Sequence, residues 1–212
     1  MNKKHHISTL FLDIGGVLLT DGWDHQSRQK AAKIFQLNYE EMEKRHYLNF
    51  ETYELGQMTL STYLDRVVFY QSRGFSKDDF KTFIFQQSVA YPEMISLSIL
   101  LKKKYGLKVG VISNEARELN EYRIKKFKLN DFIDFFISSS FVNLRKPDAA
   151  IFSLALDIAQ VNSIECIYID NQPMFVKIGE GFGMKGITHS DYHSTVEQLR
   201  AYGLEILTDE HG

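Results

Sequence analysis

The 212-residue sequence contains only one cysteine, three prolines and one tryptophan. The single cysteine, Cys166, excludes an intrachain disulfide, which fits a reducing compartment, and we expect a cytoplasmic location. No uncharged apolar run approaches the roughly 18 residues that a bilayer-spanning helix needs, so no membrane partner is expected. Residues 1–6 are basic but lack the apolar stretch and cleavage site of a signal peptide, and we interpret them as a solvated end.

The sequence also lacks a large excess of charge of either sign. Its 25 Lys and Arg residues and 27 Asp and Glu residues give a formal net charge of −2. This balance gives no indication of a nucleic-acid partner. A hydrophobic fraction of 44% and a charged fraction of 25% are typical of a globular chain and argue against disorder. The length fits one domain with a modest insertion.

Residues 25–90 show helical spacing of apolar side chains and almost no strand-like runs. Gly56 separates two helical patterns, and the segments 59–62 and 76–79 predict the N-caps of further helices. We therefore expect a small all-helical unit whose many aromatic residues mostly form its core. The apolar positions of these patterns include Ala31, Ile34, Phe35, Tyr39, Tyr63, Val67, Tyr70, Phe80, Phe83 and Ile84.

Outside this segment, short apolar runs alternate with helical patterns, which predicts parallel βαβ units. The expected fold class is α/β, a doubly wound parallel sheet with a small all-helical cap inserted after the first strand. The expected domains are an α/β core of residues 1–20 and 91–212 and a helical cap of residues 21–90. Strands are predicted at 8–13, 107–112, 132–137, 166–169 and 185–188, and helices at 94–104, 115–127, 148–160 and 175–182.

Three polar residues stand where apolar strand runs end: Asp13, Ser113 and Asp170. In doubly wound sheets, ligands bind in the crevice beyond the carboxyl ends of the strands. We therefore expect these three side chains to meet at one edge of the sheet.

Four segments carry a family resemblance. They are Phe-Leu-Asp-Ile-Gly-Gly-Val-Leu (11–18), Val-Ile-Ser-Asn (111–114), Leu-Arg-Lys-Pro (144–147) and Tyr-Ile-Asp-Asn (168–171). In this order and spacing they resemble the four motifs of the haloacid dehalogenase-like (HAD) hydrolase superfamily, over residues 8–190. The helical insert resembles the α-helical cap of one branch, and Arg145-Lys146-Pro147 and Gly15-Gly16 look most similar to its sugar-phosphatase-like members.

The resemblance implies a Mg²⁺-dependent phosphatase that cleaves a small phosphorylated metabolite through an aspartyl-phosphate on Asp13. A carboxylate attacks a phosphate dianion poorly because like charges repel, so a cation and a lysine are needed to neutralise charge. The residues implied as catalytic are Asp13, Lys146 and Ser113. The implied phosphate ligands are Ser113, Asn114 and Lys146, and the implied metal ligands are Asp13, the Gly15 carbonyl and Asp170, with Asn171 bonded to a metal-bound water.

Two positions depart from the family pattern. The phosphatases usually carry a second Asp at the position of Gly15, where it protonates the leaving group, and such catalysis contributes roughly 10²- to 10⁴-fold. We assign no substitute; Asp21 and His25, on the loop toward the insert, are the candidates. Family members often carry an acidic residue at the position of Asn171, so we predict that Mg²⁺ binds more weakly here than in a site with a second acid at that position.

Three alternative functions stay open. The chain is a weakly active or inactive family member that binds a ligand or partner, a haloacid dehalogenase that needs no metal, or a receiver-type phosphorylation domain. The helical insert argues against the last, and Asp170 argues against the second. We further expect Trp23 to line a pocket, Cys166 to lie in the core, and the scattered histidines to be surface residues.

Overall fold

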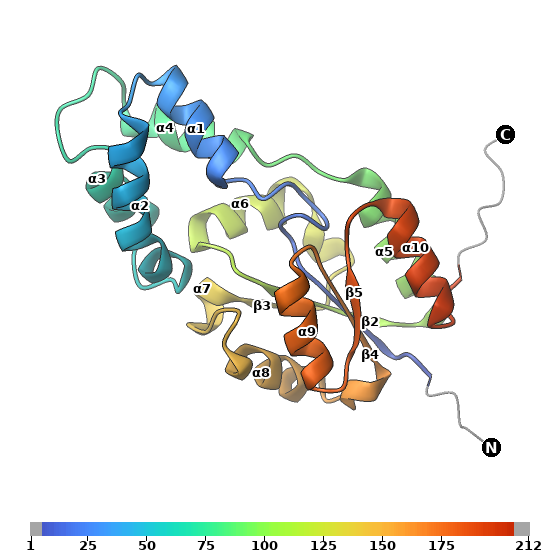
Figure 1. Cartoon of the computed structure of the whole chain (residues 1–212). Helices are drawn as coiled ribbons and strands as arrows, with labels where there is room; N and C mark the ends of the chain where they lie inside the picture. The colour runs from blue at the N-terminus through green and yellow to red at the C-terminus, as the bar shows by residue number, and fades with distance from the viewer. Residues whose placement is uncertain (1–5, 206–212) are drawn as a thin grey trace, which may run out of the picture.

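A five-stranded parallel sheet forms the centre of the computed structural model, which describes residues 6–205 (Figure 1). The strand order is β3-β2-β1-β4-β5, and every neighbouring pair is parallel. This arrangement confirms the predicted α/β fold class. Residues 1–5, most of the end that we predicted to be solvated, lie outside the described residues. The strands are β1 (Thr9–Leu12), β2 (Lys108–Ser113), β3 (Phe135–Ser138), β4 (Cys166–Asp170) and β5 (Lys185–Thr188).

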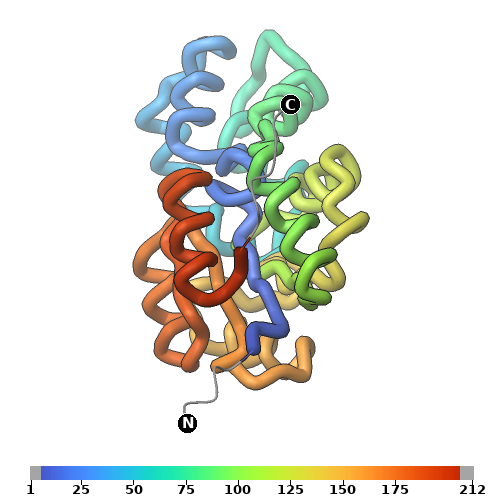
Figure 2. The backbone as a smooth tube through the Cα atoms, turned by 90° about the vertical axis from the view of Figure 1, so that its right-hand side faces the viewer, coloured from blue at the N-terminus to red at the C-terminus, as the bar shows by residue number. Residues whose placement is uncertain are grey.

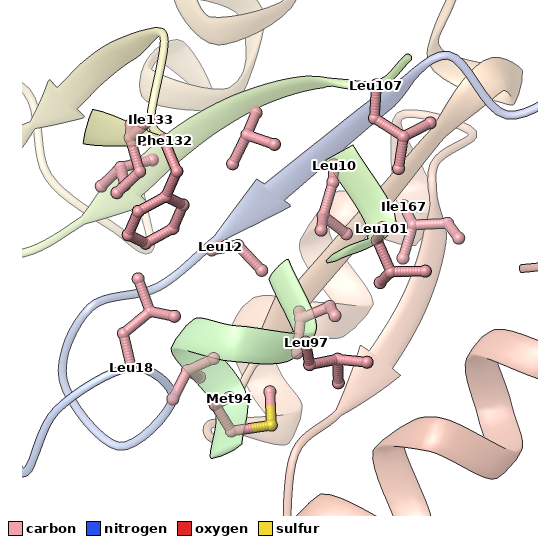
Figure 3. Close-up of a cluster of buried hydrophobic side chains, with 14 of the residues drawn as sticks. Leu10, Leu12, Leu18, Met94, Leu97, Leu101, Leu107, Phe132, Ile133 and Ile167 are labelled. Carbon is pink, nitrogen blue, oxygen red and sulfur yellow. The ribbon is translucent and has the colours of Figure 1, made fainter. Parts of the chain in front are cut away.

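Helices cover both faces of the sheet, which is why the central strand has no polar face. Leu10 and Leu12 of β1 pack with α5 and α10 on one face (Figure 3), while Phe11 packs with α8 and α9 on the other. Cys166 is buried in the second cluster, as predicted. Within residues 6–205, no helix has the length and apolarity to cross a membrane. The helices of the sheet layer are α5 (Pro92–Tyr105), α6 (Arg117–Lys126), α7 (Ser139–Val142), α8 (Ala149–Ala159), α9 (Pro173–Gly181) and α10 (Tyr192–Ala201), with 3-10 turns η1 (Leu129–Asp131) and η2 (Ser163–Glu165).

Four helices between β1 and α5 form a layer of their own beside the sheet (Figures 1 and 2). We call residues 21–90 the helical segment; the domain boundaries at its two ends stay a prediction. Its apolar core is rich in aromatic rings, and Tyr53 and Tyr63 stack with their centroids 4.5 Å apart. Leu119 of α6 packs against this core and joins it to the sheet layer. The helices are α1 (His25–Ile34), α2 (Tyr39–Glu54), α3 (Leu60–Val67) and α4 (Lys77–Gln86).

The structure confirms part of the helix pattern predicted for this segment and corrects the rest. Thr59 and Ser76 cap α3 and α4 through their side chains, as predicted. The pattern from residue 31 to 39 divides between two helices, because α1 ends at Ile34, whose side chain is 55% exposed. Helix α3 ends before Tyr70, which instead lies under the guanidinium group of Arg45.

The strand predicted at 132–137 was placed too early. Phe132 and Ile133 belong to the turn before β3, and both pack into the sheet core (Figure 3). Asp134 ends this turn: its backbone N–H donates to the Val109 carbonyl, and its carboxylate accepts from the Val109 N–H. A buried turn and a buried strand have the same apolar composition, so the sequence pattern does not separate them. Helices α7 and α10 were not predicted.

Buried Arg123 of α6 joins the two chain segments that connect the sheet to the helical segment. Its guanidinium group donates to the Thr20 carbonyl at 3.0 Å, to Ser88 Oγ at 3.0 Å and to the carboxylate of Glu115. Gly22 lies directly against it, since a Cβ at this position would fall 1.8 Å from an Arg123 nitrogen. The Arg123 and Glu115 side chains are both buried, so their charges are stabilised by each other and not by water.

We predict that Arg123→Met lowers the free energy of unfolding by about 3–5 kcal/mol, because it leaves the Glu115 carboxylate buried without its partner. Urea unfolding at pH 7 measures the change. Arg200→Met, on the exposed face of α10, is the matched control and should change stability by less than about 0.5 kcal/mol. Equal stabilities of the two variants would contradict the prediction.

Candidate active site

Polar side chains from three strand ends and one loop meet at the carboxyl edge of the sheet. Asp13 follows β1, Ser113 ends β2, Asp170 ends β4, and Lys146 comes from the loop between α7 and α8. Nζ of Lys146 lies 3.1 Å from Oδ2 of Asp13 and 2.6 Å from Oδ2 of Asp170. All four side chains are buried. The structure therefore brings together the residues for which we predicted one site, while their chemical roles stay predictions.

The loop after β1 turns closely against the sheet edge. The Ile14 N–H donates to Oδ1 of Asp13 at 2.8 Å and lies 3.5 Å from Oγ of Ser113. Gly16 has a φ of +72°, and a Cβ at this position would lie 2.0 Å from Nδ2 of Asn171. Glycine is needed here both for the left-handed backbone and for the close approach of Asn171.

Neighbouring groups hold Lys146 and Asp170 in place. The Asn114 amide accepts from the Lys146 N–H at 2.8 Å and donates to its carbonyl at 2.9 Å. Asn114 thus positions Lys146, and the predicted phosphate contact would fall to its backbone N–H. Asp170 accepts from the Tyr168 hydroxyl and, through Oδ1, from the Gln172 N–H at 2.7 Å. We did not predict Tyr168, although it stands two residues before Asp170 on one strand and so on the same face.

The charges of this group do not cancel. Two carboxylates face one ammonium group, which leaves one negative charge in a space with little water. Burial raises the pKa of Asp13 to about 6, with Lys146 lowering it and Asp170 raising it. Burial acts to lower the pKa of Lys146, but the two carboxylates raise it above its ordinary value. The site therefore favours a further cation beside its carboxylates.

A cavity of about 410 Å³ opens above these residues, between the sheet edge and the helical segment. Trp23 lines it, which confirms that prediction, and so do Gly15 and Asp21. His25, the other acid candidate, lies exposed on α1 outside the cavity. The helical segment also contributes Arg28, His46, Phe50, Tyr53 and Glu54, none of which we predicted as site residues.

His46 corrects the expectation that the histidines are surface residues, since its side chain is half-buried in the cavity wall. The Tyr63 hydroxyl accepts from Nε1 of Trp23 at 2.9 Å and lies 2.7 Å from Nδ1 of His46. Tyr63 is fully buried, so its own proton needs an acceptor, and Nδ1 of His46 supplies it. Burial, and next the charge of Arg28, lower the pKa of His46 to about 4. The imidazole is therefore neutral at pH 7 and carries its proton on Nε2.

The donor set fits Mg²⁺. In residues 6–205, no three His, Cys, Asp or Glu side chains form a metal-binding group, but Mg²⁺ commonly uses one or two carboxylates and keeps several waters. The shared contact with Lys146 places the Oδ2 atoms of Asp13 and Asp170 within about 6 Å of each other. A carboxylate has about four acceptor positions. The contacts described above use two on Asp13 and three on Asp170, which leaves each carboxylate able to bind a metal.

Sequence comparison identifies relatives of the chain. A profile of the haloacid dehalogenase-like hydrolase family matches residues 7–183. Bifunctional epoxide hydrolase 2 of Sus scrofa is 26% identical over 127 residues, which are 58% of this chain and 22% of that protein. The chain thus spans about a fifth of the length of the curated relative that it matches.

Solved structures share the fold at low sequence identity. A HAD family enzyme from Bacteroides thetaiotaomicron, also solved in complex with magnesium and inorganic phosphate, superposes with a TM-score of 0.74 at 24% identity over 86% of this chain and 93% of that chain. A HAD-like family hydrolase from Porphyromonas gingivalis has a TM-score of 0.71 at 16% identity over 92% and 98%. An L-2-haloacid dehalogenase has a TM-score of 0.61 at 17% identity, with 84% of each chain covered.

The family profile covers most of the chain, and the solved relatives share its sheet and helices. The four segments that carry the resemblance all lie within the matched residues. The chain belongs to the haloacid dehalogenase-like hydrolase family.

Proposed function

We propose that the chain is a Mg²⁺-dependent phosphatase that cleaves a small phosphorylated metabolite through an aspartyl-phosphate on Asp13. The observation that carries this proposal is the contact of one buried ammonium group, Lys146, with two buried carboxylates, Asp13 and Asp170, at the base of a cavity. Such a group can hold a dianion only when a second cation is present. A cytoplasmic location stays a prediction.

Asp13, Asp170 and the Gly15 carbonyl would hold the metal ion. When bound, Mg²⁺ neutralises the charge that two carboxylates and a phosphate group bring together. The four charged groups without it sum to −3, because a phosphate dianion adds two negative charges to the site. At about 4 Å and an effective dielectric of about 20, each unit-charge pair is worth about 4 kcal/mol. Phosphate binding without the metal should therefore be weak.

The reaction of the chain's own groups has two steps. A carboxylate oxygen of Asp13 forms a bond to phosphorus while the ester bond to the leaving oxygen breaks, which transfers the phosphoryl group to Asp13. Water then attacks the aspartyl-phosphate, releases inorganic phosphate and restores the carboxylate. Lys146 donates to the phosphate oxygens, and Ser113 and the Asn114 backbone hold the others.

The cavity walls in the helical segment would contact the organic part of the substrate. Trp23, Phe50 and Tyr53 present aromatic rings, and neutral His46 offers one N–H donor on Nε2. A volume of about 410 Å³ suits a small molecule. These walls favour a small phosphorylated metabolite with an oxygen that accepts a hydrogen bond.

We expect Asp13→Asn to lower the rate of phosphate monoester hydrolysis with Mg²⁺ by at least about 10³-fold, because an amide cannot form the acyl phosphate. A panel of phosphorylated sugars and nucleotides, assayed with Mg²⁺ and with EDTA, provides the measurement. Asp157→Asn, exposed on α8, controls for the loss of one charge. Activity that survives Asp13→Asn would refute the mechanism, and metal-independent chloride release from a 2-haloacid would indicate a dehalogenase instead.

Asn171→Asp should tighten Mg²⁺ binding by about tenfold, because it adds a negative charge beside the metal ligands without a change in side-chain size. Isothermal titration calorimetry with MgCl₂ measures the dissociation constant directly. Asn130→Asp, exposed in η1, adds the same charge away from the site and should leave that constant unchanged. An unchanged constant for Asn171→Asp would contradict the assignment.

His46 makes the stability of the protein pH-dependent. Between pH 6.5 and pH 4 the unfolded chain binds a proton on this side chain that the folded chain does not bind. The free energy of unfolding therefore decreases as the pH is lowered from 6.5 to 4, by up to about 3 kcal/mol. Urea unfolding across this range should show a flatter pH dependence for His46→Gln. His193→Gln, exposed on α10, should keep the wild-type slope; identical slopes for wild type and His46→Gln would show that His46 is not held neutral.

A further inference from the structure

The leaving oxygen of an alkyl phosphate needs a proton that the groups at the base of the cavity cannot supply. In an in-line displacement the leaving oxygen lies on the side of phosphorus opposite the attacking oxygen of Asp13. Lys146 lies on the side of Asp13, where it is bonded to both carboxylates. A proton donor must therefore come from the walls of the cavity.

Asp21 has the position that this task requires. It lines the same cavity as Asp13, and an ideal Cβ on Gly15 would lie 3.0 Å from Oδ1 of Asp21. The carboxyl group of Asp21 therefore occupies the space beside position 15, two residues after Asp13, that a side chain there would fill. Its side chain is exposed, so a bound molecule can reach it.

The backbone on both sides of Asp21 is fixed. The Thr20 N–H donates to the Val89 carbonyl at 2.8 Å, and the Thr20 carbonyl accepts from buried Arg123 at 3.0 Å. Gly22 follows in the left-handed region with a φ of +75° and lies against Arg123. Asp21 thus projects from a short, rigid segment, which suits a group that must meet a substrate atom in one place.

The other carboxyl groups of the cavity wall have structural partners. Asp24 caps α1 by accepting from the Ser27 N–H at 2.7 Å. Glu54 accepts from Arg145 at 2.8 Å, and Glu115 is paired with buried Arg123. Within residues 6–205, the carboxyl group of Asp21 makes no comparable side-chain hydrogen bond or ion pair. Asp21 is therefore the cavity carboxyl group whose side chain is available for chemistry.

We propose that Asp21 is a catalytic residue that gives the leaving oxygen its proton, an inference that rests on the proposed function. As the Asp13 oxygen bonds to phosphorus and the ester P–O bond breaks, the carboxylic acid proton of Asp21 moves to the leaving oxygen, giving an alcohol and the Asp21 carboxylate. In the second step that carboxylate takes a proton from water, while the water oxygen bonds to phosphorus and the P–O bond to Asp13 breaks. Asp21 ends protonated, as it began.

Asp21→Asn tests this role with two esters that differ in their leaving groups. An alkyl ester such as glycerol phosphate needs the proton, whereas 4-nitrophenyl phosphate releases a phenolate that does not. We expect kcat/KM with Mg²⁺ to fall by about 10²- to 10⁴-fold for the alkyl ester and by less than about tenfold for the aryl ester. Asp21→Glu should recover part of the alkyl activity, and exposed Asp157→Asn should leave both values unchanged.

A second readout does not depend on turnover. Because Asp21→Asn also removes the base of the second step, acid quenching during 4-nitrophenyl phosphate turnover should trap a phosphorylated enzyme, seen as added mass in the intact protein. Equal losses with both esters, or no loss with the alkyl ester, would overturn the assignment of Asp21. If the wild-type protein with Mg²⁺ hydrolyses neither these two esters nor any phosphorylated sugar or nucleotide of the panel, the proposed function fails and this inference fails with it. If Asp13→Asn abolishes activity and Asp21→Asn does not discriminate between the esters, only this inference fails.

Discussion

The candidate active site depends on the contact of one buried ammonium group with two buried carboxylates. Lys146, Asp13 and Asp170 come from segments that are far apart in the sequence, and they meet only because β1 and β4 are neighbours and the loop before α8 folds over their ends. Burying these charges costs free energy, and the attraction between one positive and two negative charges does not recover that cost. Much of the surrounding structure serves to hold them: Asn114 fixes the Lys146 backbone, while Tyr168 and the Gln172 N–H satisfy Asp170.

The sheet and three of the four side chains at the base of the site follow from short-range patterns in the sequence, whereas Lys146 was predicted from the family resemblance. An apolar run that ends at a polar residue marks the end of a parallel strand, and parallel strand ends share one edge. Asp13, Ser113 and Asp170 are therefore predicted to meet without knowledge of any distance. Tyr168 could have been predicted in the same way, since strand alternation places it on the face of Asp170.

The wall of the cavity does not follow from such patterns. His46 stands on an ordinary amphipathic helix, and only the packing of α2 against α3 and Trp23 makes it half-buried and neutral. In the sequence, Arg123 does not differ from the other charged residues of α6. In the structure it is fully buried, and it is bonded to Thr20, Ser88 and Glu115 from three separate stretches of chain. Long-range contacts of this kind have no local signature. The start of β3 was predicted too early for a different reason, because a buried turn and a buried strand have the same apolar composition.

The contacts of Arg123 also limit how the two layers of the molecule can move. Both chain segments that lead into the helical layer are bonded to the same guanidinium group, so a large swing of that layer would separate a buried charge from its partners. Such a joint resists opening more than a pair of free linkers would. The guanidinium group thus ties both crossings of the chain between the two layers to one point on α6, and the helical layer is anchored to the sheet layer at both of its ends.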